Sequence, residues 1–114
     1  MKKMLQILPV GLLLAMNAAY ADCSRPDAPA MPDGATSSEA ELAATQTSVK
    51  EYMAQTNVYL ECLAQEEAKA PEDEAPQAAS ARIAAHNQAV DDMEVVAEQF
   101  NGAVRAWKAR SAEE

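Results

Sequence analysis

Apolar residues recur every seven positions in two long stretches of the chain, and a second apolar or aromatic set follows three residues after the first. This heptad pattern predicts two α-helices that each bury one seam against a partner helix. The predicted seam comprises Leu42, Val49, Tyr52, Tyr59 and Leu63 in the first stretch, and Ile83, His86, Val90, Met93, Phe100, Val104 and Trp107 in the second.

Local signals place the ends of both helices. Ser38 and Glu41 have the spacing of a capping box, so the first helix is expected over about residues 38–69. Pro71 and Pro76 enclose an acidic segment that interrupts the heptads, so residues 70–76 are expected to form a turn. The second helix is then expected over about residues 77–110. Since no strand pattern competes, the fold class is all-α.

The turn between the helices favours an antiparallel hairpin with coiled-coil-like packing. If the chain folds back at residues 70–76, Leu63 faces His86 near the turn and Leu42 faces Trp107 at the far end. This register matches the two seams along their whole length. The sequence therefore predicts a two-helix hairpin over residues 38–114.

Residues 22–37 are rich in proline and are expected to be extended, with a turn at Pro32-Asp33-Gly34. Cys23 and Cys62 are the only cysteines, and a disulfide between them would tie this segment to the first helix. The 15 residues from Cys23 to Ser38 reach up to about 46 Å in polyproline form, and the helix from Ser38 to Cys62 rises about 36 Å. An intermolecular disulfide and a redox-active thiol are the alternatives.

Two arrangements are open for the apolar residues beside the seam. The extended segment could cover positions such as Met53 and Leu60. Alternatively these positions, together with Ala89, Val96 and Ala103, could meet a second copy in a homodimeric four-helix bundle. The sequence does not decide between monomer and dimer.

The first 21 residues have the features of a signal peptide. Lys2 and Lys3 precede a short apolar run, and Ala19-Tyr20-Ala21 matches the small-x-small cleavage pattern. The mature chain is therefore expected to begin at Asp22, without a membrane span, in the periplasm or outside the cell. Attachment of a lipid to Cys23 fits less well, because Asp22 stands where a lipobox needs a small residue.

Charge and composition narrow the classes of function. Residues 1–21 hold two lysines and no acidic residue, so their removal changes the formal charge from −9 to −11. Such a chain repels nucleic acids and anionic membranes. With five aromatic residues in 114, it also lacks the material for an enclosed catalytic pocket, so we expect no catalytic residue and no cofactor.

His86 is the one candidate for metal chemistry. No second ligand lies one helical turn away from it, and only Tyr59, Glu66 and Glu67 of the facing helix are conceivable partners. A histidine on a seam is more often a packed structural residue. We therefore expect no metal site, and keep weak metal binding by His86 and nearby carboxylates as an alternative.

The chain also resembles a known family. Its pattern Cys23…Pro29…Pro32-Asp33-Gly34, Val49-Lys50-x-Tyr52 and Tyr59-Leu60-x-Cys62-Leu63, followed by His86-Asn87 and Phe100-Asn101, is similar to that of small exported proteobacterial proteins with no established activity. The resemblance implies a periplasmic helical hairpin and carries over no catalytic residue.

These expectations lead to a hypothesis of function. The chain is expected to be an exported, non-enzymatic structural or interaction module that binds an unknown protein partner in the bacterial envelope. The main alternative is a holdase or inhibitor that captures basic clients through its acidic surface, which salt would weaken.

Overall fold

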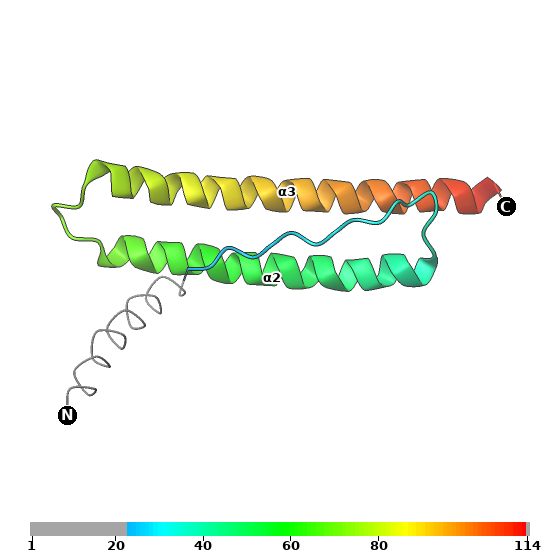
Figure 1. Cartoon of the computed structure of the whole chain (residues 1–114), viewed down its shortest axis with the longest axis horizontal. Coiled ribbons are helices and arrows are strands. Elements are labelled where there is room, and N and C mark those ends of the chain that lie inside the picture. The colour runs from blue at the N-terminus through cyan, green and yellow to red at the C-terminus, as the bar shows by residue number, and fades with distance from the viewer. Residues whose placement is uncertain (1–22, 114) are drawn as a thin grey trace, which may run out of the picture.

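The computed structural model describes residues 23–113, and within them the chain forms two α-helices and no strand. Helix α2 spans Glu39–Lys69 and helix α3 spans Pro76–Glu113. The two helices lie side by side and run in opposite directions (Figure 1). The predicted all-α hairpin is confirmed, whereas the predicted signal peptide, residues 1–21, lies outside the described residues.

Helix α2 begins at the predicted cap. The Ser38 hydroxyl accepts a hydrogen bond from the Glu41 backbone N–H at 3.1 Å, which satisfies one of the amides that the first turn leaves without a partner. Glu39 and Glu41 place negative charge at the positive end of the helix dipole. At the other end, the Ala70 N–H donates to the Glu67 carbonyl, and Pro71 follows.

Helix α3 is longer than the sequence pattern predicts. The prediction of Pro76 in the turn was wrong: α3 begins at this residue, because proline is tolerated at the first helical position, where no intrahelical amide bond is lost. It continues past the expected end at Arg110 to Glu113. The extra residues matter because Arg110 is then held on a regular helix.

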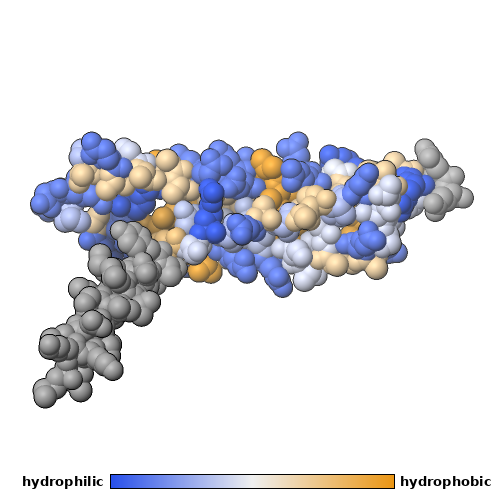
Figure 2. Space-filling view, viewed as in Figure 1, coloured by the Kyte–Doolittle hydropathy of each residue, from blue (hydrophilic) through white to orange (hydrophobic). Residues whose placement is uncertain are grey.

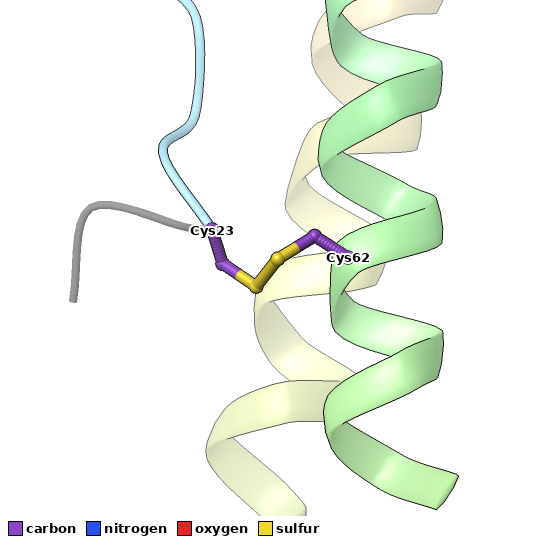
Figure 3. The surroundings of a disulfide bond; sticks show 2 residues. All are labelled: Cys23 and Cys62. Atoms are coloured by element: carbon purple, nitrogen blue, oxygen red, sulfur yellow. A yellow bond between two sulfur atoms is a disulfide. The ribbon is translucent and has the colours of Figure 1, made fainter. Parts of the chain in front are cut away.

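Residues 23–37, which we call the strap, run back along the groove between the two helices (Figure 1). A disulfide joins Cys23 to Cys62 of α2, with the two Cα atoms 5.5 Å apart (Figure 3). The predicted intramolecular staple is confirmed. Because the Cys23 sulfur is held in this bond, the disulfide form leaves no thiol there for lipid attachment.

The other end of the strap packs closely against α3. A Cβ atom added at Gly34 would overlap the backbone carbonyl of Ala103, so the two chains approach closely at this point. Arg110 then donates two hydrogen bonds across the junction, from Nη1 to the Ala35 carbonyl at 2.9 Å and from Nη2 to the Ser37 carbonyl at 2.6 Å. The strap is therefore fastened at both ends.

The predicted turn at Asp33 forms immediately before α2. Asp33 accepts hydrogen bonds from the backbone amide of Ala35 through its carboxylate, and from the amides of Thr36 and Ser37 through its carbonyl. The Ser37 hydroxyl also donates to this carbonyl, at 2.7 Å, and Ser37 is buried. The turn redirects the strap into the first turn of α2.

Prolines at every third position give the strap one packed edge. Pro26, Pro29 and Pro32 are half-buried, and so is Cys23, three residues before Pro26. Most residues between these positions are exposed. A polyproline helix repeats every three residues, so this spacing sets one edge against the hairpin. Next to this edge, Nη1 of Arg25 lies 3.7 Å from Oδ2 of Asp92 on α3.

The face drawn in Figure 2 is largely hydrophilic, with small hydrophobic patches between the polar residues. The core lies beneath the surface, where the two helices and the strap meet. Its members are the most buried residues of all three segments: Gly34, Ser37, Leu42, Tyr52, Thr56, Tyr59, Ala89, Val96 and Ala103. Thr56 is 1% exposed, and its hydroxyl donates to the Tyr52 carbonyl at 2.8 Å, so this polar core residue is satisfied within its own helix.

The deepest stripe of α3 differs from the predicted seam. Ala89, Val96 and Ala103 are buried, and each lies one residue before a predicted heptad position. The predicted members Val90, Met93, Phe100, Val104 and Trp107 are half-buried, and the prediction was wrong for Ile83 and His86, which are exposed. The physical reason is that α3 packs against α2 and the strap together, so its most buried stripe turns toward both.

The contacts of the strap with α3 show which side of the hairpin it covers. Arg25 lies beside Asp92 and Gly34 beside Ala103, so the strap follows the stripe that contains Val96. Leu60, for which coverage by the strap was one of two open arrangements, lines the hollow near the turn. Ala89, Val96 and Ala103 are buried within the folded chain itself, and a homodimer stays a prediction.

Candidate interaction surface

The hairpin has two grooves, and only one holds the strap. The opposite groove, which we call the open face, carries a hollow at each end. Leu63 and His86 line the hollow near the turn, and Leu42 and Trp107 line the hollow at the far end. These are the pairs that the antiparallel register predicts, so the two ends of the open face follow from the sequence.

The turn-end hollow has a volume of about 300 Å³. Leu60, Leu63 and Ile83 provide its apolar wall, and Ile83 is 58% exposed. Glu67, Arg82 and His86 provide its polar edge. An exposed isoleucine beside a hollow offers a contact for another apolar surface.

An ion pair fixes the edge of this hollow to the turn. Arg82 donates two hydrogen bonds to the Glu74 carboxylate, at 2.8 and 2.9 Å, and both side chains are about four-fifths covered. These hydrogen bonds lower the pKa of Glu74 below its ordinary value, and they raise the pKa of Arg82. Two-point pairing of this kind fixes the orientation of the guanidinium as well as its position.

The far-end hollow has a volume of about 360 Å³ and combines aromatic and acidic residues. Phe100 and Trp107 lie seven residues apart on α3 and both line it, with Leu42 of α2 opposite. Glu39 stands at its edge, in the first turn of α2. Aromatic faces and a carboxylate in one hollow suit a cationic group.

The structure brings His86 together with one of its three conceivable partners. His86 shares the turn-end hollow with Glu67, but Glu66 lines a different hollow beside Cys62, and Tyr59 is buried. The His86 ring also contacts its neighbour Asn87, whose Oδ1 lies 3.5 Å from Nδ1. Among the described residues, no group of three His, Cys, Asp or Glu side chains is placed to hold a metal ion.

The sequence pattern does not indicate the roles of two residues. The pattern predicts Arg110 only as the end of the second helix, whereas its side chain donates hydrogen bonds to two carbonyls next to the start of α2. The pattern predicts Gly34 only as part of a turn, whereas its close approach to Ala103 sets how near the strap lies to α3. The spacing of Cys23, Pro26, Pro29 and Pro32 by three was the available signal for a packed edge.

Comparison of the chain with protein-family models, with curated proteins and with solved structures finds no match. Within residues 23–113, neither helix is long and apolar enough to cross a membrane.

Proposed function

We propose that this chain is an exported, non-enzymatic interaction module of the bacterial envelope, and that it binds a protein partner through the open face. One observation carries the proposal: the two grooves of the hairpin differ. The strap fills one groove and is tied there by a disulfide, whereas the opposite groove keeps two hollows and the exposed Ile83.

Three features support export to the periplasm or beyond. The first 21 residues have the pattern of a signal peptide. The Cys23–Cys62 disulfide fits an oxidising compartment. The resemblance to small exported proteobacterial proteins points to the same place. We expect mass analysis of the exported chain to give a first residue of Asp22 and a disulfide between the two cysteines.

Because the strap ties the two helices together, the hairpin offers a binding partner a rigid surface. The strap links both helices, through Cys62 of α2 and through Ala103 and Arg110 of α3. A partner at the open face therefore meets helices whose relative position is already fixed, which lowers the entropic cost of binding.

Photocrosslinking tests this function. A photoreactive amino acid at Ile83 probes the open face. A matched probe at Val95, which is 51% exposed, is rotated by about 120° around α3, away from the turn-end hollow. We expect the Ile83 probe to join an envelope protein in cells and the Val95 probe to join none.

Equal products from both positions, or no product from Ile83, would contradict the proposal. The variant Ile83→Glu supplies the complementary result, since a charge in the apolar wall is expected to reduce capture by a purified partner at least tenfold, with no change in helix content.

A further inference from the structure

The open face carries negative charge in addition to its apolar hollows. Within the described residues, no salt bridge involves Glu39 at the far-end hollow, although it lies beside Phe100 and Trp107. A carboxylate that shares a hollow with half-buried aromatic rings attracts a cation in two ways, through its own charge and through the negative face of the rings.

The turn-end hollow repeats this character. Its one arginine, Arg82, is already held by Glu74, whereas Glu67 lines the hollow and takes part in neither salt bridge of the described residues. The Glu67 carboxylate therefore leaves a negative charge at this edge. Both hollows thus join an apolar wall to a negative rim.

The spacing of the two hollows fits a helix. From Leu42 to Leu63, α2 rises about 32 Å at 1.5 Å per residue. A straight helix of about 20 residues laid along the groove spans this distance and forms a third helix against the pair. An amphipathic helix-in-groove contact uses apolar anchors on one stripe and charged residues at its sides.

We propose that the open face binds a cationic amphipathic α-helix of a partner protein, with aliphatic anchors in both hollows and a lysine or arginine against Glu39 and Trp107. The proposal rests on the interaction function above and names the chemistry of its partner. A second copy of this chain fits less well, because each mature copy has a formal charge of −11 and the two acidic rims would face each other.

The single tryptophan makes the site observable. Trp107 is half-buried in the far-end hollow, and no other tryptophan contributes to the fluorescence. The probe is a synthetic 20-residue helix of leucine and lysine with leucine on one stripe, added to the oxidised mature chain. We expect the Trp107 emission to shift on saturation, and a leucine and glutamate helix of the same pattern to cause no shift.

Two glutamates in one helical turn provide a matched control. Glu39 lines the hollow, whereas Glu41 lies on α2 outside it, and both are exposed in the first turn. The variants Glu39→Gln and Glu41→Gln remove the same charge from the same helix end. Glu39→Gln is expected to weaken binding of the lysine helix about fivefold, and Glu41→Gln less than twofold.

Several results would overturn the proposal. Equal losses for the two variants would show that the lysine helix is attracted only by the overall charge. An unchanged Trp107 emission would show that it does not enter the far-end hollow. If wild type is a dimer in sedimentation and Ile83→Glu converts it to a monomer, the open face binds a second copy of the chain and not a cationic helix.

Different results would contradict the interaction function and the proposed chemistry of the partner. If the Ile83 probe captures an envelope protein but the lysine helix leaves Trp107 unchanged, the partner chemistry is wrong and the interaction function stands. If the lysine helix binds as expected but no envelope protein is captured at Ile83, the interaction function is wrong and the affinity of the groove for cationic helices stands.

Discussion

Gly34 shows how much of the packing depends on a single missing side chain. The strap reaches α3 only because nothing larger than a hydrogen atom stands between this residue and the Ala103 backbone. The sequence indicated a turn at Pro32-Asp33-Gly34, and the structure has one. It did not indicate the close approach, because that contact joins residues far apart along the chain.

The variant Gly34→Ala is expected to lower the free energy of unfolding by about 1–3 kcal/mol, since the added methyl group overlaps a backbone carbonyl and the strap must move outward. Gly102→Ala is the control. A Cβ there meets only the end of the Arg105 side chain at 3.8 Å, and alanine favours the helix, so we expect a gain of about 0.5–1 kcal/mol. Urea unfolding measures both, and equal effects would contradict the close contact.

Among the elements, local signals predicted the two ends of α2 more closely than those of α3. Ser38 caps α2 as its spacing with Glu41 indicates, and α2 ends at Lys69. The seam of α3 was predicted less well, because a heptad search favours large side chains and one partner. Ala89 and Ala103 are small yet buried, and at Ala103 the strap reaches the helix backbone through Gly34.

The connection between the helices has a pH dependence that can be measured. The Arg82 hydrogen bonds lower the pKa of Glu74 below its ordinary value of 4.5. The pair therefore stabilises the fold fully above that value, and loses its contribution as the pH falls through the lowered pKa. We expect wild type to melt above Glu74→Gln at pH 6, and the difference to shrink progressively below pH 4.5.

Glu72→Gln is the control for this measurement. Glu72 is exposed in the same connection, and neither salt bridge of the described residues involves it. Its melting temperature is expected to follow that of wild type at both pH values. A constant gap between wild type and Glu74→Gln down to pH 3 would show that the pair does not stabilise the fold through the charge of Glu74.

For the whole molecule, the strap makes three segments act as one unit. It joins α2 through a covalent bond and α3 through Gly34 and Arg110. A two-helix hairpin of this size buries little apolar surface, so a covalent tie that limits the unfolded chain is a large part of its stability.

The double variant Cys23→Ser and Cys62→Ser is expected to lose up to about 4 kcal/mol of unfolding free energy, the chain-entropy value for a loop of 39 residues. Below the transition, far-UV circular dichroism is expected to show nearly unchanged helix content, because the hydrogen bonds that define an α-helix join backbone groups. Urea unfolding of reduced wild type is the control, and it should agree with the variant. A loss below 1 kcal/mol would show that Gly34 and Arg110 hold the strap without the disulfide.

Features that depend on near neighbours or on counting could be predicted from the chain alone: two helices, the Ser38 cap of the first, the acidic turn, the antiparallel register, and the pairing of the only two cysteines. Three-dimensional packing was needed to show which groove the strap fills, which stripe of α3 is deepest, and that Ile83, His86 and Trp107 line an open surface. These features depend on three segments packing together, and the free energy of that packing depends on shape across distant parts of the chain, which no periodic pattern records.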